Sequence, residues 1–187
     1  SYDPDKHHRR SIRLKGHDYA DPGAYFVTIC TWQRECLFGH VVNGEMRLND
    51  AGEIARRCWE DIPEHFPHAV LDAMAIMPNH VHGIIVVPGR GTACRAPTTE
   101  QFGRPAVGSV PTIVRSYKAT VTRLVRRRDD SATDPGAVDK GVIHHAPTGF
   151  GWQRGYYEHI VRSEAELMAI REYIQGNPAR WDDDENN

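Results

Sequence analysis

The stretch from Met77 to Pro88 is the part of the sequence that most constrains the fold. Beyond His82 its residues are almost all apolar and β-branched, and a proline and a glycine follow them, which is the pattern of a buried strand. Because side chains alternate between the two faces of a strand, His80 and His82 point the same way, about 6.5 to 7 Å apart along the backbone, while Val81 points into a core. Two imidazoles presented in this way can chelate one divalent ion. The alternative is a histidine pair that is only hydrogen-bonded or solvated at a strand end.

Periodicity along the rest of the chain predicts a sheet crossed by helices. The expected strands are 24–32, 69–77, 80–87 and 151–162, and the expected helices are 51–62, 109–128 and 163–177. Asn43-Gly44 lies between two short apolar runs and predicts a small hairpin within 37–48. The order is that of an α+β fold: a ferredoxin-like βαββαβ antiparallel sheet with helices on one face, plus a C-terminal helix that carries Tyr173.

Length and composition favour one soluble domain. The 187 residues are 40% hydrophobic and 26% charged, and no run approaches the roughly 18 apolar residues of a membrane helix. We expect an N-terminal arm over 1–22, one catalytic domain over 23–181 with long loops at 89–108 and 129–150, and an acidic tail over 182–187. The four cysteines show no CxxC spacing, which disfavours zinc knuckles and disulfide frameworks. The N-terminus lacks the apolar core of a signal peptide, so the expected location is cytoplasmic.

The charge distribution is uneven. The net charge is −2, but four of the negative charges lie in the tail. The segment from Ser109 to Arg128 contains no acidic residue. Its helix carries a basic face that favours contact with nucleic-acid phosphates over the plainer interpretation, a solvated helix surface. Stacking or phosphate contacts are also expected from Trp152 and Arg154 in the last expected strand. The candidate DNA-binding residues are Arg115, Lys118, Arg126, Arg127, Trp152 and Arg154.

Two motifs in the expected order carry a family resemblance. His80-Val81-His82 follows Met77-Pro78-Asn79, and Tyr173-Ile174 precedes Asn177-Pro178 on the C-terminal helix. The chain therefore resembles the HUH single-tyrosine transposases. Trp152-Gln153-Arg154, followed by Tyr156-Tyr157-Glu158-His159 and Arg162, points to one branch, the REP-associated tyrosine transposases. The resemblance runs from about Tyr25 to Trp181 and is weak across the two loops.

The resemblance implies an enzyme with a metal and a tyrosine nucleophile. His80 and His82 would bind a divalent ion, Mg²⁺ or Mn²⁺, and Tyr173 would attack single-stranded or hairpin DNA to leave a 5′-phosphotyrosine and a free 3′-hydroxyl. Asn177 would be the third metal ligand, although as the residue before Pro178 it can instead be a helix C-cap. Imidazole ligands suit Mn²⁺ better than Mg²⁺, so Mn²⁺ is expected to support activity at least as well.

Several alternatives stay open at this level. Tyr173 can instead be a core residue beside Ile174, and Tyr117, Tyr156 and Tyr157 are other tyrosines in the same half of the chain. A domesticated protein that binds repeat hairpins with little turnover is the main rival function, and a metallohydrolase that uses water is another. The tail is expected to fold back over a basic DNA surface and inhibit it. No membrane partner is expected, and the protein acts as a monomer or a homodimer.

Overall fold

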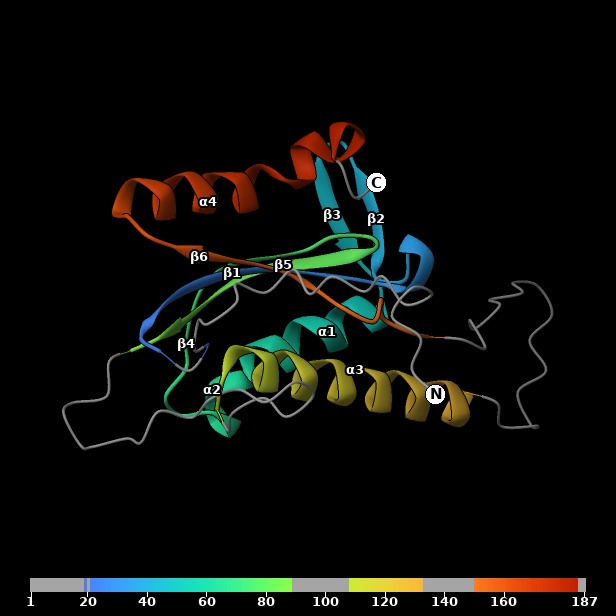
Figure 1. Cartoon of the computed structure of the whole chain (residues 1–187). Coiled ribbons are helices and arrows are strands. Elements are labelled where there is room, and N and C mark those ends of the chain that lie inside the picture. Colours follow the sequence, from blue (N-terminus) through green and yellow to red (C-terminus); the bar gives the residue numbers. More distant parts are fainter. Residues whose placement is uncertain (1–18, 20, 89–107, 133–149, 185–187) are drawn as a thin grey trace, which may run out of the picture.

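Four strands form the central sheet of the computed structural model, which describes residues 19, 21–88, 108–132 and 150–184 (Figure 1). The strands are β1 (Gly23–Cys30), β4 (Val70–Ile76), β5 (His80–Val87) and β6 (Tyr157–Val161). Their order across the sheet is β4-β5-β1-β6, and every neighbouring pair is antiparallel. The first and third strands of the βαββαβ unit lie at the centre, as in a ferredoxin-like sheet. The predicted fold class is confirmed.

Helices cover both faces of this sheet. The two crossover helices α1 (Asp50–Glu60) and α3 (Val110–Ala132) share one face, as predicted, and α4 (Glu164–Gly176) lies on the other (Figure 1). The larger core forms beneath the sheet, where Trp59 and Tyr117 pack with Val81. A smaller cluster on the α4 side joins Phe26, Ile84 and Ile174. Alternation along β5 therefore assigns Val81 to the α1–α3 face and both histidines to the α4 face.

Local signals explain where several elements begin. The Asn49 side chain accepts a hydrogen bond from Gly52 N at 2.9 Å at the start of α1, and Ser163 Oγ accepts one from Glu166 N at 3.2 Å at the start of α4. The predicted hairpin is formed by β2 (Gly39–Val42) and β3 (Glu45–Leu48). Its turn places Asn43 at φ 53° and Gly44 at φ 77°, the left-handed pair that a tight two-residue turn requires.

Several predicted boundaries differ from the structure. The strand expected over 24–32 ends at Cys30, and Trp32 lies in the 3-10 segment η1 (Trp32–Arg34). The helix expected to end at 128 continues to Ala132, into the predicted loop 129–150. The helix expected over 51–62 ends at Glu60, and Pro63 lies in the first turn of a second, short helix, α2 (Ile62–His65), where no backbone N–H is needed. The last strand is shorter than 151–162, because only an isolated bridge between Thr31 and Trp152 precedes β6.

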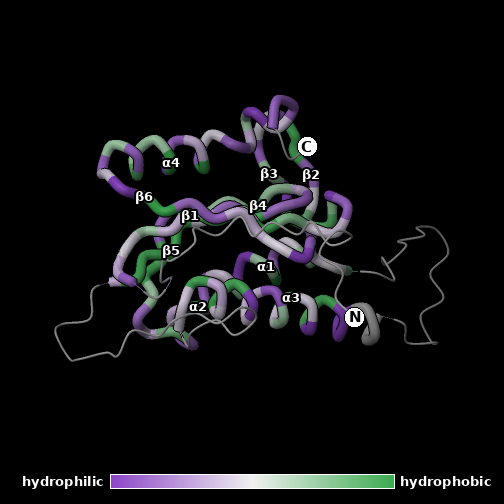
Figure 2. Tube along the Cα trace, viewed as in Figure 1, coloured by the Kyte–Doolittle hydropathy of each residue, from purple (hydrophilic) through white to green (hydrophobic). Residues whose placement is uncertain are grey.

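The last described residues of the chain form a short helix where the sequence predicted an acidic tail. A 3-10 helix, η2 (Pro178–Asp183), follows α4 and lies beside β3, so Asp182 and Asp183 belong to it. The predicted arm lies mostly outside the described residues, as do 89–107 of the first loop and 185–187 of the tail. Hydrophobic and hydrophilic turns alternate along α3 and α4 in Figure 2, as expected of helices with one buried side. Within the described part of the chain, every helix is too short or too polar to cross a bilayer.

Candidate metal and tyrosine site

The two histidines lie side by side at the start of β5, as the strand pattern predicted. His80 and His82 are 0% and 1% exposed, and their Nε2 atoms are 2.9 Å apart. Both rings are held by β1, because Cys30 pairs with His80 and Thr28 pairs with His82. The rigid centre of the sheet therefore fixes the spacing of the two imidazoles before anything binds.

Each imidazole has a second partner at its other nitrogen. His80 Nδ1 lies 2.7 Å from Asn79 Oδ1, and His82 Nδ1 lies 2.9 Å from Thr28 Oγ1. The Asn79 amide nitrogen donates to the Arg34 carbonyl, so Asn79 Oδ1 is the acceptor and His80 Nδ1 carries the hydrogen. This leaves the Nε2 lone pair of His80 directed at the shared space. Histidines that ligate metals are usually oriented in this way by their other ring nitrogen.

Burial keeps both imidazoles neutral. Loss of solvation lowers the pKa of His80 to about 4, against the opposing influence of Asp184. Loss of solvation, followed by the charge of neighbouring His80, lowers the pKa of His82 to about 3. Neutral imidazoles near pH 7 have lone pairs available for coordination.

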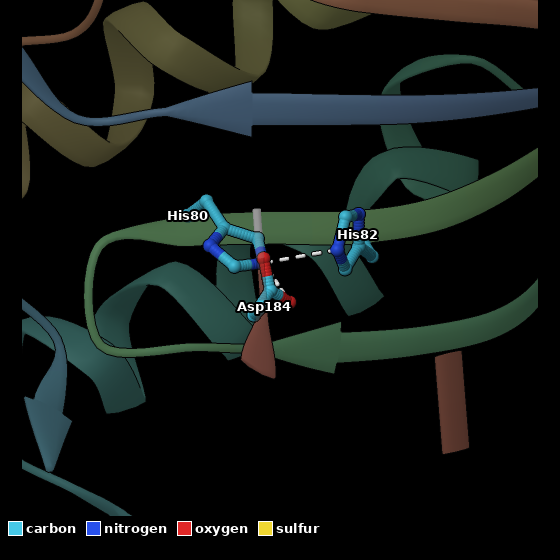
Figure 3. Close-up of side chains that lie close together, drawn as sticks. All are labelled: His80, His82 and Asp184. Atoms are coloured by element: carbon cyan, nitrogen blue, oxygen red, sulfur yellow. Dashed lines mark hydrogen bonds and ion pairs between the residues drawn. The ribbon is translucent and has the colours of Figure 1, made fainter. Parts of the chain in front are cut away.

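Asp184 completes a group of three possible metal ligands. Its side chain is 1% exposed, and its Oδ2 lies 3.9 Å from His80 Nε2. The ligand atoms of His80, His82 and Asp184 all lie within 4.8 Å of one another. Figure 3 shows the three side chains gathered at the start of β5. Two neutral nitrogens and one carboxylate suit a divalent transition ion such as Mn²⁺, so the residues fit the metal that the resemblance implies. Sequence reasoning missed Asp184, because it assigned the run of acidic residues from 182 onward to a tail outside the catalytic domain.

Asn177, the predicted third ligand, lies behind Asp184. Its amide nitrogen donates to Asp184 Oδ2 at 2.6 Å, and its backbone N–H closes the end of α4 on the Ile174 carbonyl. The side chain is buried, and its Oδ1 accepts no hydrogen bond from the described residues. Asn177 thus caps the helix and orients the carboxylate, and its role as a direct ligand stays a prediction.

Tyr173 faces the histidines from α4. Its hydroxyl lies 3.3 Å from His82 Nε2, and its ring makes edge contacts with His82 and Phe26 at centroid distances of 5.2 and 6.1 Å. The residue is 38% exposed, which is inconsistent with the alternative of a core tyrosine. Tyr117 is the core tyrosine instead: it donates to the Ala55 carbonyl, and burial raises its pKa well above the usual value.

The comparisons with known proteins agree with this geometry. The sequence matches no family model. A protein of Haemophilus influenzae without an assigned function is 41% identical over 189 residues, which cover 98% of this chain and 96% of that protein. A second Haemophilus influenzae protein, named as a REP-associated tyrosine transposase, is 23% identical over 163 residues, or 87% of this chain and 74% of its own length.

The solved structure of a REP-associated tyrosine transposase bound to a REP hairpin has the same fold. It superposes with a TM-score of 0.55 at 16% identity, and the match covers 91% of this chain and 74% of that chain. The named relative and the two motifs in their expected order support the resemblance to REP-associated tyrosine transposases. The solved structure, at 16% identity, shows the fold.

The helix that carries Tyr173, α4, is anchored to the sheet on two sides. The Arg171 guanidinium donates two hydrogen bonds to the Asp72 carboxylate, at 2.9 and 2.6 Å, where β4 is irregular. These hydrogen bonds hold the pKa of Asp72 below its usual value. Toward the other edge, Glu166 lies 2.7 Å from His159 Nε2 and accepts from Arg162 N at 2.7 Å. The position of Tyr173 over the histidines therefore depends on polar contacts with both β4 and the end of β6.

Breaking the Asp72–Arg171 contact is expected to slow cleavage without weakening DNA binding. In Asp72→Asn the paired hydrogen bonds lose their charge, so α4 holds Tyr173 less firmly, and we expect the single-turnover rate of DNA cleavage to fall about 10-fold. The control is Glu60→Gln, which breaks the exposed Arg56–Glu60 pair on α1, on the opposite face of the sheet. Equal rates in both variants would show that this contact does not position the tyrosine.

The predicted DNA-binding residues lie mainly on the opposite face of the sheet. All of them except Arg154 line a hollow of about 590 Å³ over the exposed side of α3, which we call the α3 hollow. Arg154 is exposed and lies outside this lining. The lining residues are Arg115, Lys118, Ala119, Thr122, Arg123, Arg126, Arg127 and Trp152. Arg123, which was not among the candidate DNA-binding residues, adds a further basic side chain to this lining. A DNA stem in the hollow would thus be separated from the histidines by the sheet.

Lys118 has a structural contact that its sequence position did not reveal. Its ammonium donates to the carbonyls of Gln153 and Gly155 at 2.9 and 2.6 Å, and the Trp152 indole donates back to the Lys118 carbonyl. Burial lowers the pKa of Lys118 to about 8. Lys118 therefore holds the segment before β6 in place. Asp184, the last described residue of the predicted tail, lies with the histidine pair.

Proposed function

We propose that this protein is a metal-dependent single-stranded DNA endonuclease and strand transferase, a transposase that cleaves hairpin or repeat DNA through a covalent 5′-phosphotyrosine. The observation that carries the proposal is the Tyr173 hydroxyl, 3.3 Å from a histidine of a buried His-His-Asp group. A tyrosine hydroxyl has a pKa near 10 and is a weak nucleophile near pH 7. A cation bound next to the hydroxyl would favour the phenolate, which is the reactive form.

The metal would be held by His80, His82 and Asp184, with Asn177 orienting the carboxylate. A bound divalent ion, Mg²⁺ or Mn²⁺, supplies positive charge to the non-bridging oxygens of the scissile phosphate. The two imidazoles favour Mn²⁺. The buried rings and the sheet beneath them restrict the approach of water, which favours attack by the protein over hydrolysis.

Tyr173 is the proposed nucleophile. Its phenolic oxygen forms a bond to phosphorus while the bond from phosphorus to the DNA 3′ oxygen breaks, and the proton released by the phenol balances the one taken up by the new 3′-hydroxyl. One phosphodiester is exchanged for another, so the step can run in reverse with a different 3′ end. Strand transfer without a nucleotide cofactor follows from this balance.

A hairpin-binding protein with little turnover is the second candidate. The observation that favours it is the α3 hollow, which lies on the face of the sheet away from the histidines and can contact DNA without them. The presence of His80, His82 and Tyr173 in mutual contact favours the enzyme, because a binding protein does not need that arrangement.

The α3 hollow is the proposed contact for the phosphates of a DNA stem, by analogy with the family member whose structure contains a REP hairpin. We expect Arg126→Ala with Arg127→Ala to weaken hairpin binding and to lower the slope of log affinity against log salt by about 2, one for each lost phosphate contact. The control is Arg47→Ala, which removes an exposed arginine that pairs with Glu45 on β3. An unchanged salt slope would exclude the hollow as the phosphate site. Fluorescence anisotropy of a labelled hairpin measures both quantities.

The test of the enzyme is a denaturing gel with hairpin DNA from the repeats that flank the gene, labelled at either end of the cleaved strand. With Mn²⁺, the proposal expects the fragment that begins at the cleavage site to migrate with the protein and the other fragment to end in a free 3′-hydroxyl. A chelator should abolish both products. Cleavage without a protein-linked fragment would indicate a hydrolase, and tight binding without cleavage would indicate the hairpin-binding protein.

A further inference from the structure

A tight turn after β1 carries an exposed tryptophan next to the histidine site. The turn is the short 3-10 segment Trp32–Arg34, and Cys30, the last residue of β1, pairs with His80. Trp32 is 52% exposed. Gln33 and Arg34 have φ of 51° and 58°, so two consecutive residues other than glycine adopt the left-handed conformation. Such backbone strain persists only where surrounding contacts impose it, and it is concentrated at functional sites.

The contacts that impose this conformation lead to His80. The Asn79 side chain accepts from His80 Nδ1 at 2.7 Å through its oxygen and donates to the Arg34 carbonyl at 3.1 Å through its nitrogen. Backbone bonds from Thr31 N to the Asn79 carbonyl, at 2.8 Å, and from Trp32 N to the Gly151 carbonyl, at 2.9 Å, hold the start of the turn. One asparagine thus orients a metal-binding histidine and fixes the turn beside it.

The turn also brings positive charge to the site. Arg34 lies in this turn, and its backbone carbonyl is joined through the Asn79 side chain to His80 Nδ1. Trp32 and Arg34 are both exposed. An exposed indole and a guanidinium in one short turn suit an unpaired nucleotide, because any base stacks on an aromatic ring and arginine contacts the adjoining phosphate. A paired base hides its faces in the duplex, so the same surface selects against double-stranded DNA.

We propose that the Trp32–Arg34 turn is a docking platform for the unpaired nucleotide next to the cleaved phosphate, with the base stacked on Trp32 and the phosphate held by Arg34. This inference rests on the proposed function, since it assigns a single-stranded extension of the hairpin to one side of the histidine site. The α3 hollow and this platform would then bind different parts of the DNA. The hairpin stem would lie over α3, and the single-stranded extension would lie at the end of β1. Specificity for DNA with an unpaired extension follows from the platform.

The test compares two DNA probes in the presence of a chelator, so that no cleavage occurs. One is the flanking-repeat hairpin with its single-stranded extension, with 2-aminopurine placed at each extension position in turn, and the other is the same hairpin without the extension. We expect Trp32→Ala to weaken binding of the extended probe about 10-fold, to abolish the quenching of one 2-aminopurine, and to leave the second probe unaffected. Trp32→Phe should retain most of the affinity and the quenching, because the phenyl ring still stacks.

Two further variants separate the roles of charge and of exposed surface. Arg34→Asn removes the charge but keeps a residue that tolerates the left-handed backbone, and it should lower the salt slope for the extended probe by about 0.7. Val70→Ala alters an equally exposed apolar residue, 53% exposed, on β4 at the end of the sheet away from His80, and should change nothing.

DNA affinity measured with a chelator tests the platform separately from the proposed endonuclease, because the measurement requires no cleavage. Equal loss of affinity for both probes in Trp32→Ala, or no loss for either, would overturn the platform even if the wild-type protein forms the covalent product. A selective loss for the extended probe would support the platform even if the wild-type protein forms no covalent product, a result that would overturn the proposed endonuclease alone.

Discussion

Tyr173→Phe should abolish the covalent protein–DNA product, reducing its formation at least about 1,000-fold. The substitution removes the phenolic oxygen, which lies 3.3 Å from His82 Nε2, and keeps the ring that packs on Phe26. Binding of the hairpin should stay within about twofold of wild type, because the α3 hollow is untouched. The measurement is the denaturing gel described above, run beside an anisotropy titration with the same DNA.

Tyr157→Phe is the matched control for this change. Tyr157 is another exposed tyrosine whose ring contacts Phe26, at a centroid distance of 6.2 Å, but it comes from β6 and not from α4. The Tyr157→Phe variant should form the covalent product at the wild-type rate. If the covalent product forms in Tyr173→Phe and is lost in Tyr157→Phe, the nucleophile is Tyr157 of β6, which would contradict the proposed role of Tyr173.

His82→Ala is expected to produce the second large effect, a loss of Mn²⁺ affinity of about 100-fold or more. His82 supplies one of two neutral nitrogens in the buried group, and alanine leaves the ion with His80 and Asp184 alone. The paramagnetic resonance signal of free Mn²⁺, titrated against the protein without DNA, measures the affinity directly. Covalent product should be lost in parallel.

Two comparisons test the composition of the metal site. Asp184→Asn keeps a side chain of the same shape next to Asn177 but removes the charge, and it should weaken Mn²⁺ binding about 10-fold. His40→Ala removes an exposed histidine on β2 and should leave the affinity unchanged. Wild-type affinity in His82→Ala would contradict the His-His-Asp site, and wild-type affinity in Asp184→Asn would exclude the carboxylate as a ligand.

Sequence reasoning succeeded where the decisive interactions are local. The twofold period of a strand places His80 and His82 on one face and Val81 on the other, whatever the strand packs against. The hairpin turn at Asn43-Gly44 depends on neighbouring residues alone, and it is confirmed.

Predictions that required distant parts of the chain were less complete. An acidic residue in a charged terminal run does not reveal whether it is solvated or buried, and Asp184 is buried because η2 turns back beside β3 and directs it to the histidines. Lys118 was read as a phosphate contact from the charge of its helix face, whereas two backbone carbonyls from the segment before β6 accept its hydrogens.

By itself, the sequence determined the order of strands and helices along the chain and the shared face of the histidine pair. Alternation, helical periodicity and turn chemistry, which predict these features, act over a few residues. Only the tertiary structure decided that Tyr173 contacts His82, that Asp184 lies with the histidines, and that the basic helix lies on the other side of the sheet. These features depend on which face of the sheet each helix covers and on where the chain returns after α4, and burial of distant apolar surfaces sets both.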